Sequence, residues 1–451
     1  NSSSPGNVDD YGEVDQLSGR ISALYTPTEA FSWLVVYERF TDKGTPTLGV
    51  PNPLPRGEDV FDRAVDTNPD FPGLGSPELD VDFQVLRSRM RWDFSEGLAF
   101  TWVTGYGSLE RYQVSDIDGG AGTDRLGTPQ PLNLWGVQDK ANDFFSHDLQ
   151  LQSTDGGNFQ WTLGAFYFEE DNDTFFPFQI VGSEQIGQPP LATRLFNNNG
   201  QNQEAWAAYG QGTYSITDTV RVTAGLRYTE DTKIIEDGNV FLCAFQPDLT
   251  MLDRSLCRLS SHREGQEKFD AITWRAGIDW DMSDDILLYG SATTGFKSGG
   301  FSNFQIWDEE TVLTIEAGLK GTFLDGTLRL NAALFTSSFE DMQLSQVQEG
   351  VQVTDNAGEA TINGLEIEGT WLIGDNTTVE GFASWLDAEF DEYVDVCDSS
   401  QNRCNSPTAT LLDLSGNKLN RSPEWSLNLA IQHEFSVGSN GTLTPRLSVH
   451  W

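Results

Sequence analysis

Apolar and polar residues alternate along much of this chain, and this period of two constrains the fold more than any other feature. The segment 312–320 shows the alternation clearly. One set of alternate positions is apolar and comprises Leu313, Ile315, Ala317 and Leu319. The other set comprises Thr314, Glu316, Gly318 and Lys320. Successive side chains of a β-strand point to opposite faces, so this segment predicts a strand that is apolar on one side only.

The preceding segment, Leu288–Phe301, predicts a second strand followed by a tight bend. Small residues such as Gly290 alternate there with polar residues such as Ser291. The strand gives way to Ser298-Gly299-Gly300, where the missing side chains let the backbone bend sharply. Two neighbouring strands of this kind predict a large antiparallel sheet.

The same alternation recurs along the chain, and the connections between strands alternate in length. Alternating segments occupy 17–25, 31–38, 86–92, 221–228, 272–280, 365–371 and 425–434. Short connections are expected near 26–30, 95–97, 154–158, 215–219, 281–285, 323–327, 374–377 and 436–441. Long ones are expected near 41–80, 111–142, 170–202, 232–266, 298–310 and 393–422, with a tight tip near 348–350 as the exception.

A half-buried sheet of a soluble protein would alternate in the same way, so the connections decide the fold class. Short turns at one end and long loops at the other are typical of an outer-membrane barrel. The sequence therefore predicts an all-β fold, a transmembrane antiparallel up-and-down β-barrel with about 16 strands in this chain. Its polar face would line a lumen and its apolar face would contact lipid. Aromatic residues near the short turns fit an interfacial girdle: Tyr25, Phe31, Trp92, Phe94, Phe100, Tyr214, Trp280, Trp371 and Phe435.

Composition limits the class of protein and its partners. A chain of 451 residues exceeds one ordinary core, so several domains or one very large sheet are expected. No apolar run reaches the roughly 20 residues of a membrane-spanning helix. A net charge of −41 repels phosphate, so nucleic acid is not expected as a partner. The acidic excess fits either a field that gathers cations or the solubility of exposed loops.

The four cysteines fall into two local pairs in polar, turn-rich segments, Cys243 with Cys257 and Cys397 with Cys404. Such pairs predict two disulfides, each closing its own loop, and an oxidising compartment. Metal ligation requires a tighter cluster, and no metal site is expected from His147, His262, His433 and His450. His262 is the histidine nearest to a cysteine pair and is expected to be a surface residue.

Arginines on the polar side of several strands have two interpretations. They are Arg87, Arg89, Arg221 and Arg275. They could pair with acids across the lumen, which is the favoured interpretation, or they could guide an anionic substrate.

Three blocks in the second half of the chain carry recognisable motifs. Leu288–Phe301 contains Gly-Phe-Lys-Ser-Gly-Gly-Phe, Asn356–Trp371 contains Asn-Ala-Gly followed by Gly-Leu-Glu-Ile-Glu-Gly, and Leu419–Asn428 contains Pro-Glu-Trp. These blocks resemble segments of the TonB-dependent outer-membrane receptors. The first half matches that family only in the spacing of its predicted strands. All three blocks belong to the barrel.

The resemblance implies a barrel of about 22 strands closed by an N-terminal plug. Residues 1–451 would then be a receptor-like β-barrel domain, incomplete at both ends, with about three strands beyond each end. The plug and the TonB box are absent from this sequence. The chain begins at Asn1 without a signal peptide, and it is expected to be a piece of a longer precursor.

The leading functional hypothesis is an active transporter of the cell outer membrane of a Gram-negative bacterium. It would take up a scarce nutrient, with a ferric siderophore as the first choice. Its partners would be outer-membrane lipid, the small-molecule iron chelate, and TonB with its inner-membrane energising complex. The alternative is a passive porin or a surface-binding barrel without energy coupling. A plug sequence upstream would favour transport, whereas a signal peptide leading straight into strands would favour the porin.

In the transport hypothesis the outer loops carry the ligand contacts. The candidate contact residues are aromatic, because rigid rings offer a large contact area: Trp135, Phe175, Phe176 and Trp307. The alternative role for each of them is packing between loops. No catalytic residues and no cofactor are expected, since no nucleophile elbow, zinc motif or His–acid–Ser arrangement is found in the sequence.

Overall fold

The computed structural model describes residues 12–46, 78–116, 132–182, 193–244, 253–301, 306–348, 351–395, 412–438 and 441–451. Most of these residues form β-strands, and the main sheet has 17 strands. A 3-10 turn, η3 (Arg254–Leu256), is the one helical segment within these ranges. Among the residues described, no helix combines the length and the apolar character needed to cross a membrane.

The strands follow one another with few interruptions. The first ten are β1 (Gln16–Thr28), β2 (Phe31–Asp42), β3 (Glu78–Ser95), β4 (Leu98–Asp116), β5 (Leu132–Ser153), β6 (Phe159–Gly182), β7 (Thr193–Ser215), β8 (Val220–Cys243), β9 (Cys257–Ser283) and β10 (Ile286–Lys297). The later long strands are β13 (Glu310–Phe323), β14 (Leu328–Gln348), β15 (Val351–Ile373), β16 (Thr377–Asp395), β18 (Trp425–His433) and β21 (Arg446–His450). Short pairings involve β11 (Gly300–Phe301) with β12 (Ile306–Trp307), β17 (Leu412–Asp413) with β16, and β19 (Phe435–Ser436) with β20 (Thr442–Leu443).

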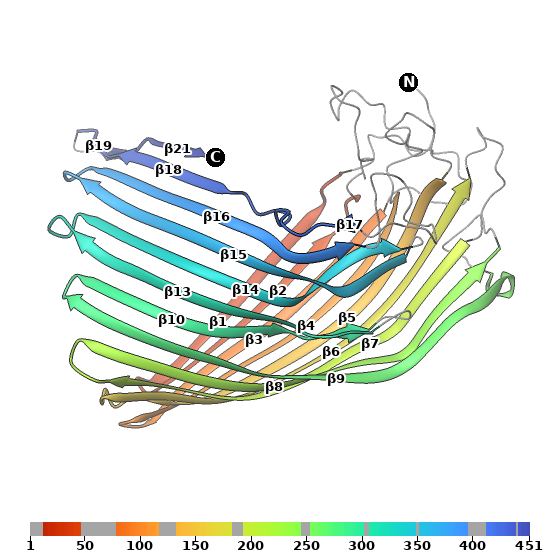
Figure 1. The fold of residues 1–451 in the computed structure, drawn as a ribbon, viewed down its shortest axis with the longest axis horizontal. Coiled ribbons are helices and arrows are strands. Elements are labelled where there is room, and N and C mark those ends of the chain that lie inside the picture. The colour runs from red at the N-terminus through yellow and green to blue at the C-terminus, as the bar shows by residue number, and fades with distance from the viewer. Residues whose placement is uncertain are drawn as a thin grey trace.

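Each long strand pairs antiparallel with the next long strand of the chain. The order runs from β1 to β10 and continues through β13, β14, β15, β16, β18 and β21. Among the described strands, β1 pairs in register only with β2, and β21 only with β18. Figure 1 shows the sheet curling into a trough, with the strands of the first half behind those of the second half. The predicted up-and-down topology and strand number are confirmed.

The two faces of the sheet separate apolar from polar residues. On the predicted lipid face Ile278 is 51% exposed, Trp274 41% and Leu427 40%, while Leu365 is partly exposed. A compact water-soluble core would bury these side chains, and so large an exposed apolar surface marks an interaction site. The alternate positions lie on the opposite face, where Asp281 of β9 forms an ion pair with Arg221 of β8. The sheet is therefore apolar outside and polar inside.

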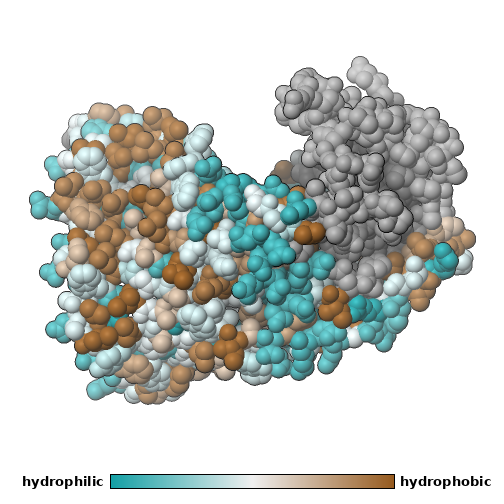
Figure 2. Space-filling model, viewed as in Figure 1, coloured by the Kyte–Doolittle hydropathy of each residue, from teal (hydrophilic) through white to brown (hydrophobic). Residues whose placement is uncertain are grey.

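The apolar surface is concentrated toward the short turns. In Figure 2 hydrophobic residues gather on that half of the visible face, and hydrophilic residues cover the part nearer the long loops. Trp280, Trp371 and Phe435 lie beside short turns and are exposed. This arrangement agrees with the predicted girdle at one membrane interface.

The strands extend farther toward the long loops than the alternation predicts. Several stretches predicted as loop are strand: 111–116, 132–142, 170–182, 193–202, 232–243 and 257–266. The run Glu169–Asp173 shows why, because it is polar at every position yet belongs to β6. Beyond the membrane both faces of a hairpin meet water, so the alternation ends although the ladder of hydrogen bonds continues.

Candidate functional site

Ion pairs between neighbouring strands line the polar face of the sheet, which we call the inner wall. Glu38 of β2 contacts Arg20 of β1 at 3.3 Å and also pairs with Arg87 of β3. Arg221 of β8 donates to Asp281 of β9, with one N–O distance of 3.0 Å. Arginines and acids thus alternate across adjacent strands, and the wall is polar without carrying a single sign of charge.

The four arginines named in the sequence analysis form two groups, which differ in whether a carboxylate of the described residues lies in ion-pair range. Arg87 and Arg221 are ion-paired, which agrees with the favoured interpretation. Within the described residues no carboxylate lies in ion-pair range of Arg89 or Arg275. These two cations are therefore available to a negatively charged group in the lumen.

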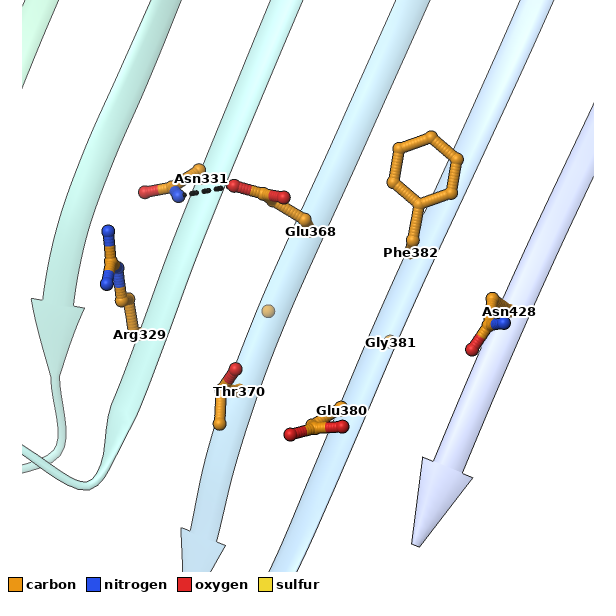
Figure 3. A pocket seen from close by; sticks show the side chains of 9 residues that line it. Arg329, Asn331, Glu368, Thr370, Glu380, Gly381, Phe382 and Asn428 are labelled. Atoms are coloured by element: carbon orange, nitrogen blue, oxygen red, sulfur yellow. Dashed lines mark hydrogen bonds between the residues drawn. The ribbon is translucent and has the colours of Figure 1, made fainter. Parts of the chain in front are cut away.

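A polar hollow of about 370 Å³ opens in the inner wall over β14, β15, β16 and β18. Figure 3 shows side chains of all four strands projecting around it, with Asn331 donating to Glu368 at 2.7 Å. Glu380 lines the same hollow and accepts from Arg446 of β21 at 2.7 Å. Phe382 also lines the hollow, so this surface can hold water, polar groups or an apolar part of a passing solute.

Two amide side chains fasten the connection between β10 and β13 to the wall. Gln343 of β14 donates to the carbonyl oxygens of Ser298 and Asp308, each at 3.0 Å. Asn356 of β15 accepts from the backbone N–H of Asp308 at 2.7 Å and donates to its carbonyl at 3.0 Å. Asn356 also donates to the carbonyl of Asp341 at 2.9 Å. We call Gln343, Asn356 and Asp308 the loop clamp.

Glycine-rich packing completes this clamped region. A Cβ atom at Gly300 would lie 2.5 Å from Cζ2 of Trp307, and one at Gly299 would lie 2.2 Å from the ring of Phe269. Phe301 is buried, with the guanidinium of Arg263 5.0 Å from the centre of its ring. The glycines are thus required for close approach of aromatic rings, and two of the three recognisable sequence blocks meet here.

The predicted ligand contacts lie in strands, which corrects their assignment to loops. Phe175 and Phe176 belong to β6, where Phe175 pairs in register with Asp139 of β5. Trp135 also belongs to β5, and its side chain lies outside the described part. Trp307 lies in the short strand β12 and packs on Gly300. The structure therefore brings Trp135 and Phe175 onto adjacent strands, and it holds Trp307 in the clamped loop.

One predicted disulfide is confirmed. Cys243 and Cys257 are bonded and face each other in register where β8 ends and β9 begins. The second pair, Cys397 and Cys404, lies outside the described residues. The disulfide closes the β8–β9 hairpin within its own loop, as the local spacing predicts.

Lys418 lies in the segment that precedes β18 and connects this segment to β16. Nζ of Lys418 donates to Asp387 at 2.5 Å and lies 3.1 Å from Glu389. The hydrogen bond to Asp387 raises the pKa of Lys418 most, and the hydrogen bond to Glu389 raises it further. Sequence reasoning missed this contact and the clamp, because each joins residues from separate strands.

The fold and its two faces define a class of protein. An antiparallel sheet that curls, is apolar outside and ion-paired inside, and has short turns at one end is a transmembrane β-barrel wall. A family-wide sequence model described as "TonB dependent receptor-like, beta-barrel" matches residues 32–450. The chain belongs to the TonB-dependent receptor-like β-barrel family, whose members are outer-membrane proteins of Gram-negative bacteria.

Solved structures and curated proteins with similarity to the chain agree with the family. The ferric yersiniabactin uptake receptor FyuA from Yersinia pestis has a TM-score of 0.72 at 15% identity, over 99% of this chain and 61% of that one. The siderophore receptor PiuA from Acinetobacter baumannii has a TM-score of 0.67 at 16% identity, over 95% and 63%. The pesticin receptor of Yersinia enterocolitica is 25% identical over 189 residues, which are 40% of this chain and 26% of that protein. The chain thus spans less than two thirds of each of these relatives.

Proposed function

We propose that this protein is an outer-membrane receptor that takes up a ferric siderophore, with energy supplied by TonB and its inner-membrane partners. The match of almost the whole chain to FyuA, described as a ferric yersiniabactin uptake receptor, carries the proposal. The structures of PiuA and of BauA, described as a ferric preacinetobactin receptor, support the same cargo class. The family itself is one of receptors and transporters rather than enzymes.

The polar inner wall suits the passage of a hydrated, hydrogen-bonding solute. Ion pairs such as Arg221–Asp281 neutralise opposite charges locally on the wall. Arg89 and Arg275 would provide cationic groups for the acidic oxygens of an iron chelate. On the long-loop side, Trp307, Phe175, Phe176 and Trp135 would supply aromatic contact area for capture. The clamp keeps Trp307 in a fixed position, which lowers the ordering cost of binding.

The transport proposal is tested with the intact receptor gene in a strain that lacks its own copy. Cells starved of iron are given radioactive iron as yersiniabactin-type, catecholate or preacinetobactin-type chelates. We expect saturable uptake of one chelate class that requires both the receptor and TonB. Uptake that persists without TonB and does not saturate would instead identify a passive pore.

Ligand capture is tested by binding to the purified intact receptor. The substitution Trp307→Ala should weaken binding of the transported chelate about tenfold, equivalent to ~1.4 kcal/mol, because a rigid aromatic contact is lost. Trp371→Ala is the matched control, since Trp371 is exposed beside a short turn and should leave binding unchanged. Equal affinity of both variants would remove Trp307 from the ligand contacts.

A further inference from the structure

Four polar side chains meet on one face of the β8–β9 hairpin. Asn239 of β8 and His262 of β9 are partners in register. Asp237 lies two positions from Asn239 and Glu264 two positions from His262, so each pair shares a face of its strand. Arg263 points to the other face, toward the ring of Phe301. The four side chains are therefore neighbours although the two strands contribute residues that are far apart in sequence.

Hydrogen bonds orient the imidazole of His262. Nδ2 of Asn239 donates to Oδ1 of Asp237 at 2.5 Å, and Oδ1 of Asn239 lies 2.8 Å from Nδ1 of His262. A carboxylate only accepts, so the amide must turn its NH₂ group to Asp237 and its oxygen to His262. The amide oxygen also only accepts, so Nδ1 carries the hydrogen. Nε2 is then the ring nitrogen that is turned away from Asn239.

The other ring nitrogen lies beside a carboxylate. Nε2 of His262 is 3.4 Å from Oε1 of Glu264. The potential ligand atoms of Asp237, His262 and Glu264 lie within 4.8 Å of one another. Small side-chain rotations would bring them to the shorter ligand separations around a metal ion.

We propose that Asp237, His262 and Glu264 bind one divalent first-row transition-metal ion on the outside of this hairpin. Nε2 of His262 and carboxylate oxygens of Asp237 and Glu264 would be the protein ligands, and water would complete the coordination. One imidazole with carboxylates suits Zn²⁺ or Cu²⁺ better than Ca²⁺ or Mg²⁺, which prefer oxygen alone. Asn239 would orient His262 through Nδ1, as supporting groups do for metal-binding histidines. The ion would cross-link β8 to β9 independently of any transported cargo.

The proposal is tested by titrating Zn²⁺ into the intact, tag-free receptor at neutral pH. The heat of binding and the number of metal ions bound per receptor are measured. We expect one saturable equivalent. His262→Ala should weaken that binding at least tenfold, and Glu264→Gln should weaken it severalfold. His450→Ala is the matched control, because it removes a histidine from another strand and should bind like the unchanged protein. Heat-modifiable mobility in gels shows that each variant is folded.

Cu²⁺ electron paramagnetic resonance supplies a second readout that does not depend on affinity. The bound ion should show coupling to one imidazole nitrogen, and His262→Ala should lose that coupling. Absence of saturable Zn²⁺ binding would overturn the proposal. Binding that is unchanged in folded His262→Ala would overturn it equally.

Discussion

At the scale of single residues, the packing around Trp307 depends on two glycines, whose lack of a side chain leaves room for aromatic rings. Gly300 lets the indole of Trp307 lie directly on the backbone, and Gly299 does the same for Phe269. The loop clamp then satisfies the polar groups of the connecting segment, with Asn356 making both a donor and an acceptor contact with Asp308. Close aromatic packing and hydrogen bonding therefore fix the same short stretch.

The packing predicts the effect of adding a side chain at position 300. Gly300→Val should displace Trp307 and separate β11 from β12, at a cost of about 1–3 kcal/mol typical of overpacking. Limited proteolysis of the intact receptor should show faster cleavage between 298 and 310. Gly19→Val is the control, because a Cβ at Gly19 meets no atom within 4 Å. Equal cleavage of both variants would contradict the packing described.

The Lys418 contact predicts a pH dependence at the alkaline end. Its folded-state pKa is raised by Asp387 and Glu389, so its contribution is fully present below the unfolded-state pKa of about 10.4. The contribution is lost as the pH rises through the folded-state value. Digestion of segment 413–420 by an alkaline protease should therefore accelerate above about pH 10.4, relative to an unstructured peptide.

Lys418→Met provides the comparison for this pH dependence. The variant should be digested rapidly at all pH values and should lack the alkaline step, because the ion pair is already gone. An identical pH profile in the two proteins would show that Lys418 does not hold this segment.

At the scale of elements, the hairpins on the long-loop side are longer than the alternation indicates. β8 and β9 remain paired as far as Cys243 and Cys257, well past the alternating segments 221–228 and 272–280. The register shifts between Ile235 and Gly238, and this irregularity sets which residues of β8 face His262. A disulfide at the end of such a hairpin limits fraying of a segment that the membrane does not support.

Removing the disulfide should therefore act locally. The double variant Cys243→Ser, Cys257→Ser loses a cross-link that is worth about 3 kcal/mol for a loop of roughly 15 residues. Hydrogen exchange should increase near the ends of β8 and β9, while heat stability of the barrel stays unchanged. Ser260→Ala, in the same hairpin, should leave exchange unaltered. A loss of overall barrel stability would show that the disulfide stabilises the whole barrel and not only the β8–β9 hairpin.

At the scale of the whole molecule, the sheet sorts its residues between two solvents. Trp274 and Ile278 of β9 project from the apolar face, while Arg275 between them occupies the inner wall. Every residue on such a strand meets either lipid or the lumen, and the same substitution should have opposite consequences on the two faces.

Paired arginine substitutions test this division. Ile278→Arg should destabilise the barrel by about 2–4 kcal/mol, because a cation would lie in the hydrocarbon region. Ser291→Arg is the matched inner-wall change on the neighbouring strand, where Glu316 is its partner in register, and it should stay within about 0.5 kcal/mol. Urea unfolding of the intact receptor in lipid vesicles measures both. Similar losses in the two variants would contradict the assignment of faces.

Much of the wall could be predicted from the sequence. Alternation in 312–320 and its counterparts identified the strands, their number and the short turns, because a period of two is a local property of each segment. Loop boundaries were less accurate, since polar runs such as Glu169–Asp173 carry no period. Trp135, Phe175 and Phe176 were assigned to loops but lie in β5 and β6, and their contact with a ligand stays a prediction.

Residues in different strands meet only when the register is fixed. Gln343 and Asn356 reach Asp308 across a bulge at Asp341 and Met342, and Asp237 reaches His262 beyond the irregular register of β8. The sequence by itself determined which face of the sheet each side chain occupies. Pairing between strands decided which side chains touch, because register depends on the bulges and curvature of the assembled sheet and not on any one segment.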